Sequence, residues 1–349
     1  MLFASGRGMP KIATEILSPD AVYRAAAILR DGGLLAFPTE TVWGLGANAF
    51  DVVACRRIFQ AKGRPQDNPL IVHVADADGL MAATTQLGPE EEALIARFMP
   101  GPLTLVVPRG ARIHPEVTGG RPDVGVRMPR LAIARELLAL AGVPVAAPSA
   151  NRSGRPSPTT FEMATAAMQG RAEGILEGPP CEVGLESTVA RVHCGEIHIL
   201  RPGAITAEEL WRAVPHLRPI IAYSEPIAGA PRAPGLKYAH YRPRARVIAA
   251  ETVPELLTAA RAVAAQGALA VLWQAAELSP SVVAELPVGT ALHPYDSLPS
   301  YAQHLFAWFH ALDEANVATI IAHLPVNDGL GRALRNRISK AAEPIAALP

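Results

Sequence analysis

The chain has 349 residues, which is long for one hydrophobic core, so we expect two domains. Hydrophobic residues make up 50% and charged residues 18%, a composition that excludes a disordered chain. Lys plus Arg and Asp plus Glu both number 32, so the net charge is zero. This balance argues against a dedicated nucleic-acid binder, although it leaves room for a local basic groove and a weak contact with RNA.

The cysteines and the apolar segments indicate the compartment. Cys55, Cys181 and Cys194 are too few and too scattered for a disulfide framework, so we expect reduced thiols in a cytoplasmic protein. The N-terminus has no continuous apolar run of the kind found in secretory signals, and residues 1–8 read as an extension. The most apolar stretch, 253–273, is interrupted by charged residues, so no membrane span is expected.

The first two hundred residues alternate between helical and strand patterns, which predicts an α/β fold with helices covering a twisted, mixed sheet. Buried strands are expected over 34–37, 70–74, 103–107, 124–128, 143–147, 174–178, 187–192 and 197–201. Helices are expected over 51–63, 89–101, 131–141 and 160–169. Thr206 and Glu209 form a capping box for a last short helix. We assign residues 10–216 to this first domain.

The amino-acid composition of the chain changes at residue 217. Residues 217–245 are rich in proline and poor in apolar runs, so they are interpreted as a linker. A strand and helix rhythm then returns, with expected helices near 253–265, 299–315 and 329–342. This pattern predicts a smaller, Rossmann-like parallel α/β domain over residues 246–345.

Several polar loops follow buried strands or helices, where binding groups usually lie. FPTETVWGLG places Thr41 after the first strand, and the flanking glycines allow a ligand to approach the backbone closely. KGRPQDNP brings Lys62 and Arg64 within three positions in a loop stiffened by prolines. Cations of this kind suit phosphate oxygens, although a solvated surface turn is the alternative for such a motif taken alone.

The second half of this domain repeats the pattern. VGVRMP places Arg127 inside an apolar strand, where a buried guanidinium must pair with a carboxylate or an anionic ligand. APSANRSGRPSP combines Ser149 and Ser157 with cations and glycine, which is good phosphate-binding chemistry. GLESTV puts Ser187 at the start of a strand, and ILRPGA ends a strand with Arg201.

The order of these motifs resembles the YrdC-type L-threonylcarbamoyladenylate synthases. The motifs PTETVWGLG, KGRPQDNPLIVHV, VGVRMP, APSANRSG, GLESTV and ILRPGA span about residues 10–210. The linker motif APGLKYAHYRP and the closing α/β segment extend the resemblance to nearly the whole chain, in the long two-domain form. The resemblance implies a nucleotidyltransferase that joins L-threonine, bicarbonate and ATP into threonylcarbamoyl-AMP and releases pyrophosphate. It also implies Mg²⁺ on the triphosphate and a tRNA threonylcarbamoyl transferase complex downstream.

The resemblance implies roles for individual residues by motif position. The threonine-binding group is Thr41, His73, Arg127, Ala147 and Ser187. The ATP-binding group is Arg64, Asn68, Ser149, Ser157 and Arg201. Lys62 is added because of its charge and its proximity to Arg64, and both are expected to act by charge stabilisation without a covalent nucleophile. Asp123, where relatives often carry threonine, is left out because a carboxylate would repel phosphate.

The linker motif predicts a lid. A carbamate breaks down in water, so a site that makes one needs to be covered. We expect PGLKYAHYRP to fold over the substrates with Lys237, His240 and Tyr241 facing them.

Three alternatives remain at this point. One is an RNA-binding module, which the neutral charge and missing stacking motifs disfavour. Another is carbamoyl transfer in metal-centre maturation, although no Cys-rich segment accompanies the domain. The third is a sensor that binds threonine or nucleotide without turnover.

Overall fold

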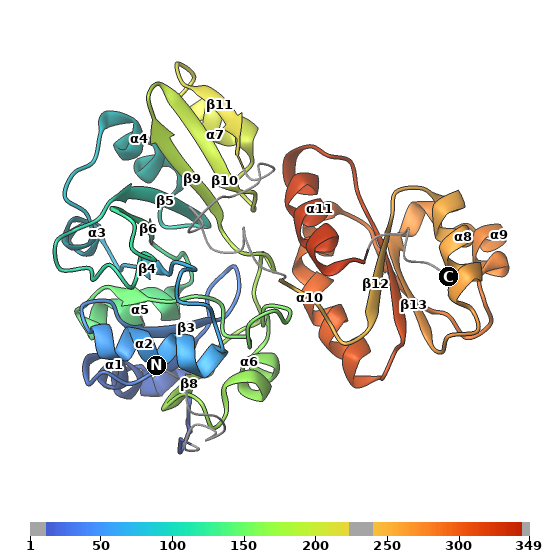
Figure 1. Ribbon diagram of the computed structural model, residues 1–349, viewed down its shortest axis with the longest axis horizontal. Helices are drawn as coiled ribbons and strands as arrows, with labels where there is room; N and C mark the ends of the chain where they lie inside the picture. Colours follow the sequence, from blue (N-terminus) through green and yellow to red (C-terminus); the bar gives the residue numbers. More distant parts are fainter. Residues whose placement is uncertain (1–11, 223–239, 344–349) are drawn as a thin grey trace, which may run out of the picture.

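The computed structural model describes residues 12–222 and 240–343, which form two α/β units side by side (Figure 1). The two-domain α/β architecture expected from the sequence is confirmed, with a large mixed sheet first and a small parallel sheet second. Among the described residues, no helix is long and apolar enough to cross a membrane.

The first unit is built on an eleven-stranded sheet in the order β1-β8-β2-β3-β7-β4-β6-β5-β9-β10-β11. Its strands are β1 Glu15–Leu17, β2 Leu35–Phe37, β3 Gly44–Asn48, β4 Ile71–His73, β5 Leu103–Pro108, β6 Asp123–Arg127, β7 Val145–Ala146, β8 Gly174–Leu176, β9 Thr188–His193, β10 Glu196–Arg201 and β11 Arg218–Ile221. Its helices are α1 Val22–Arg30, α2 Val52–Lys62, α3 Ala77–Ala83, α4 Pro89–Phe98, α5 Ala132–Ala141, α6 Phe161–Met168 and α7 Ala207–Ala213.

Period-two alternation along the strands divides the apolar side chains between two layers. In β2, Leu35 and Phe37 join the cluster that contains α1 and α5, whereas Ala36 joins the cluster that contains α2. Helices therefore cover both faces of the sheet, and the loops at the strand ends remain available for a site.

The predicted linker boundary at residue 217 is wrong at its first residues. Arg218–Ile221 forms β11, which pairs in parallel with β10. Pro219 has no N–H to donate, and it is accommodated because β11 lies at the edge of the sheet. Lys237 lies outside the described residues, so its place in the expected lid is untested.

The second unit has a four-stranded parallel sheet in the order β12-β15-β13-β14. Its elements are β12 Arg246–Ala250, α8 Val253–Val263, β13 Leu269–Gln274, α9 Pro280–Glu285, β14 Ala291–Tyr295, α10 Leu298–Glu314, β15 Thr319–His323 and α11 Gly329–Ala341. The sequence patterns missed β14 and α9, which are short and partly exposed. Helices α10 and α11 are turned towards the first unit (Figure 1).

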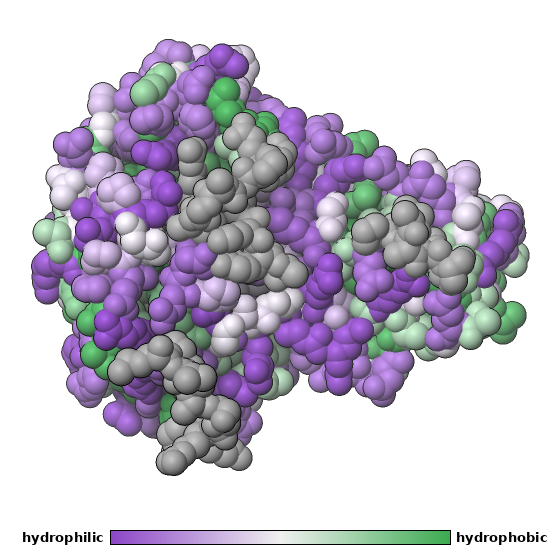
Figure 2. Space-filling view, in the orientation of Figure 1, coloured by the Kyte–Doolittle hydropathy of each residue, from purple (hydrophilic) through white to green (hydrophobic). Residues whose placement is uncertain are grey.

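The two units share an apolar interface. Val42, Met163 and Leu185 of the first unit belong to the same buried cluster as the side chains of α10 and α11. At Gly184, which has φ 74°, the loop before β9 lies directly against α10. A Cβ at this position would lie 2.4 Å from the carbonyl oxygen of Ala302, so a larger residue would not fit. The surface in Figure 2 is mostly hydrophilic, as expected when the apolar side chains are packed between layers and units.

Candidate active site

The ends of several strands and two loops of the first unit converge on one cavity, which holds about 700 Å³ of space including its open mouth. Most of the sequence-predicted residues line it: Thr41, Lys62, Arg64, His73, Arg127, Ala147, Ser149, Ser157, Ser187, Arg201, His240 and Tyr241. The exception among described residues is Asn68, which is buried beside Arg64 without lining the cavity. Asp123, which was left out of the predicted site, does not line the cavity and pairs with Arg121 at 2.9 Å and Arg191 at 3.3 Å.

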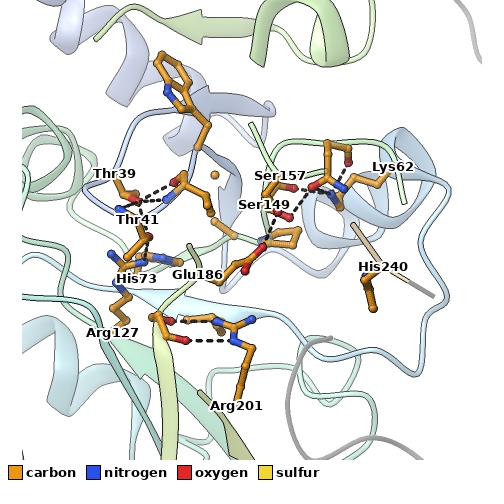
Figure 3. Close-up of a pocket in the computed structure, with 18 of the residues that line it drawn as sticks. Thr39, Thr41, Lys62, His73, Arg127, Ser149, Ser157, Glu186, Arg201 and His240 are labelled. Carbon is orange, nitrogen blue, oxygen red and sulfur yellow. Dashed lines mark hydrogen bonds between the residues drawn. The ribbon is translucent and has the colours of Figure 1, made fainter. Parts of the chain in front are cut away.

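One side of the cavity has neutral hydroxyls around a buried guanidinium (Figure 3). His73 and Arg127 are register partners at the ends of the parallel strands β4 and β6. Arg127 donates to the Thr41 hydroxyl at 2.7 Å and pairs with the Glu40 carboxylate at 2.7 Å. The partner that a buried arginine requires is therefore Glu40, which the sequence analysis had not assigned to the site.

The opposite side is cationic. Helix α2 ends at Gly63, whose left-handed conformation (φ 64°) turns the chain and lets Arg64 point inward. The Arg64 guanidinium donates to the carbonyls of Asn68 at 3.1 Å and Pro69 at 2.8 Å while lining the cavity. These contacts hold the planar guanidinium in place, where it can donate two hydrogen bonds to an anionic ligand.

Lys62 also holds the loop that carries the serines. Its ammonium donates to the carbonyls of Ser149 and Asn151. Burial and the neighbouring Arg64 lower the pKa of Lys62 well below its usual value. Lys62 therefore ties α2 to this loop, a positioning role beside the charge stabilisation expected from the sequence.

Glu186 lies between the two sides (Figure 3). Its carboxylate accepts a hydrogen bond from the Ser157 hydroxyl at 2.5 Å. Burial alone would raise the pKa of Glu186, but Arg337 and then Arg201 outweigh burial and hold it at about 2. Glu186 was not predicted as a site residue from the sequence, although a charged residue among the small and apolar residues of GLESTV requires a partner just as Arg127 does.

Arg201, the last residue of β10, and Ser187, immediately before β9, connect the two sides. The Arg201 guanidinium donates to the Ser187 carbonyl at 3.1 Å and to the Ser187 hydroxyl at 3.0 Å. Burial lowers the pKa of Arg201 to about 10, so its guanidinium stays charged at neutral pH. Of the expected lid, His240 and Tyr241 line the cavity.

Acid should destabilise the folded protein through these buried groups. Burial, together with Arg127 and Arg64 respectively, lowers the pKa of His73 and of His240 to about 3 from the ordinary 6.5. The unfolded chain therefore binds more protons between those values, so the free energy of unfolding should fall as pH drops below about 6.5. Denaturant titrations across this range should show that fall, and His73→Gln should flatten it. An identical pH dependence in this variant would contradict the expectation.

The fold and the cavity together define an α/β protein whose strand ends present cations and hydroxyls to an anionic ligand. A Sua5/YciO/YrdC family model, described as telomere recombination, matches residues 27–203. A second model, described as the C-terminal domain of threonylcarbamoyl-AMP synthase, matches residues 205–343. The chain belongs to the threonylcarbamoyl-AMP synthase family, as the resemblance of its motifs predicted.

Individual relatives agree along nearly their whole length. Threonylcarbamoyl-AMP synthase of Pyrococcus abyssi is 38% identical over 91% of this chain and 93% of its own. The Bacillus subtilis synthase is 38% identical over 92% of both chains. A crystal structure of P. abyssi Sua5 complexed with L-threonine matches with a TM-score of 0.85 and 36% identity, covering 94% of this chain and 97% of that one.

Proposed function

We propose that this chain synthesises threonylcarbamoyl-AMP from L-threonine, bicarbonate and ATP. The proposal rests above all on one observation: a guanidinium surrounded by hydroxyls and a set of phosphate-type cations share one cavity. An amino acid and a nucleoside triphosphate can therefore be held with their reacting atoms adjacent, which is the main requirement of a reaction without a protein nucleophile.

The chemistry has two steps. The threonine amine attacks the carbon of bicarbonate, with loss of water, or of carbon dioxide, with loss of a proton from the amine. The resulting carbamate carries a negative charge. A carbamate oxygen then attacks the α-phosphorus of ATP, the bond to the β-phosphate oxygen breaks, and pyrophosphate leaves with the electron pair. Both steps concentrate negative charge, so Arg64, Lys62 and Arg201 would contribute by charge stabilisation.

The two sides of the cavity suggest how the substrates divide. Thr41, His73 and Ser187 offer neutral polar atoms to an amino acid, and Arg127 offers its guanidinium to the carboxylate. Burial keeps His73 neutral at physiological pH, so His73 would read a polar atom of the substrate without adding charge. Ser149 and Ser157 would bind the nucleotide together with the cations of the opposite side.

We further propose that Mg²⁺ enters bound to the triphosphate. Glu186, the one carboxylate among the described lining residues, is already engaged by Ser157 and Arg337. Phosphate oxygens and water are the ligands that Mg²⁺ commonly uses beside nucleotides. The product is a reactive mixed anhydride, so we propose its transfer to a tRNA threonylcarbamoyl transferase complex.

The proposed reaction predicts pyrophosphate release that requires both threonine and bicarbonate. Coupled detection of pyrophosphate, with each substrate omitted in turn, measures this dependence directly. Release that needs neither substrate would refute the synthase. Binding of both ligands without release would instead indicate a sensor, and salt-dependent RNA binding without turnover would indicate an RNA-binding module.

A further inference from the structure

An arginine from the second unit completes the wall of the cavity in the first. Arg337, on α11, has a fully buried side chain. Its guanidinium donates to the Glu186 carboxylate and to the Pro202 carbonyl, both at 2.8 Å, and to the Glu186 carbonyl at 3.3 Å. These partners lie in the first unit, so Arg337 of α11 bonds to the segment just before β9 and to the segment just after β10.

Glu186 is the group through which Arg337 can affect a ligand. It lines the cavity, is 6% exposed and accepts the hydrogen bond from Ser157. Tyr241, which also lines the cavity, has its pKa raised to about 12 by burial and then by the charge of Glu186. The Arg337 guanidinium lies 5.6 Å from the centre of the Tyr241 ring. Glu186 thus connects an arginine of the second unit with two residues that line the cavity.

The sign of the charge gives this contact its importance. An unpaired carboxylate beside bound phosphates would repel them, and in a buried site this repulsion is only weakly screened. Arg337 offsets the charge of Glu186, so the field that the cavity presents to a triphosphate remains positive. The carboxylate can then serve as a fixed hydrogen-bond acceptor for Ser157 without opposing the nucleotide.

The loop that carries Glu186 is also fixed by packing. Gly184, two residues earlier, lies so close to α10 that an added Cβ would come within 2.4 Å of the Gln303 Cα atom. The Gln303 side chain donates to the Cys181 carbonyl at 3.5 Å, on the same stretch of chain. Helix α10 therefore fixes the position of the backbone of this loop, and Arg337 of α11 fixes the orientation of the Glu186 carboxylate at its end.

We propose that Arg337 is a positioning residue for nucleotide binding. By neutralising and orienting Glu186, it makes ATP affinity depend on the docking of the second unit. This inference deepens the proposed synthase function and rests on it. It assigns Arg337 no direct contact with the substrates.

The test is a double-mutant cycle with separate readouts for the two ligands. Arg337→Met should raise the KM for ATP at least about tenfold, since truncating one partner of a buried charge pair leaves the other charge uncompensated. The KM for threonine should stay within about twofold, because Arg337 neighbours the nucleotide side. Adding Glu186→Gln to Arg337→Met should recover much of the ATP affinity, because the amide oxygen can still accept from Ser157 and carries no charge. Arg337→Lys should fall between Arg337→Met and the wild type.

Arg332→Met is the matched control. Arg332 lies on the same helix and pairs with Glu208 across the same interface, away from the cavity. It should leave both KM values unchanged. Equal losses in the two arginine variants would overturn the proposal, because weakened docking alone would then explain them. It would also be overturned if Arg337→Met raised both KM values equally, or if Glu186→Gln gave no recovery.

Titration calorimetry with a non-hydrolysable ATP analogue provides a readout that does not need turnover. Arg337→Met should weaken binding of the analogue by the same factor as the KM. Unchanged analogue affinity would reject the positioning role. If wild-type protein binds the analogue but releases no pyrophosphate, the proposed function fails while the inference about Arg337 is still decided by calorimetry.

Discussion

Replacing Arg127 with alanine should reduce threonine-dependent pyrophosphate release at least roughly a hundredfold, while ATP affinity changes little. A buried, charge-assisted contact to a carboxylate is typically worth about 2–5 kcal/mol when one partner is removed. Arg127 also holds the Thr41 hydroxyl at 2.7 Å, so its loss would leave a second threonine-site group without orientation. Initial rates at varied threonine and saturating ATP, together with calorimetry of the ATP analogue, measure the two effects separately.

Stability has to be separated from ligand binding in this experiment. Arg127→Ala strands the Glu40 carboxylate in a site where its side chain is 1% exposed, a change that typically costs about 3–5 kcal/mol. The double variant Arg127→Met with Glu40→Gln removes both charges at similar volume, so it should restore the thermal unfolding midpoint. It should not restore threonine use. If it does, Arg127 supports the fold and does not bind the amino acid.

Replacing Arg201 with alanine should produce the opposite pattern, with ATP affinity reduced at least roughly thirtyfold and threonine affinity much less affected. The Arg201 guanidinium remains protonated at neutral pH and lines the cavity beside Ser187. Arg201→Lys keeps the charge but loses the planar fork, so it should recover only part of the affinity. The KM for each substrate and the affinity for the ATP analogue report the outcome.

Arg218→Ala is a suitable control for Arg201→Ala. Arg218 lies on β11 at the edge of the same sheet, and its side chain is 76% exposed. Its removal should leave both affinities unchanged, because Arg218 makes only a surface ion pair with Glu196 at 3.8 Å, and such a pair contributes roughly 0–1 kcal/mol to stability. A uniform loss for ATP and threonine in Arg201→Ala would show that the division of the cavity into two sides is wrong.

Local signals in the sequence predicted much of the first unit. Asp51 caps α2 by accepting from the amides of Val53 and Ala54, and Gly63 ends that helix in the left-handed conformation. Thr206 forms the expected capping box. These features depend on residues within one turn of each other, which is why residue type and spacing were sufficient to find them.

Weakly patterned elements escaped the sequence analysis. Ala291–Tyr295 is interrupted by Pro294 and shows no clear period. Arg218–Ile221 was assigned to the linker because of its neighbouring prolines, yet the free edge of β10 accepts it as a strand. In each case pairing with a distant strand supplied the stabilisation that local propensity did not indicate.

By itself, the sequence determined which loops carry cations and hydroxyls, and their order was enough to predict the family. Only the tertiary structure decided which partners those groups have. Glu40 pairs with Arg127 across 87 positions, and Glu186 with Arg337 across 151. A charged residue within an apolar segment indicates that it needs a partner. Which residue becomes that partner depends on the packing of sheets and helices that brings distant segments together, and no local sequence pattern specifies it.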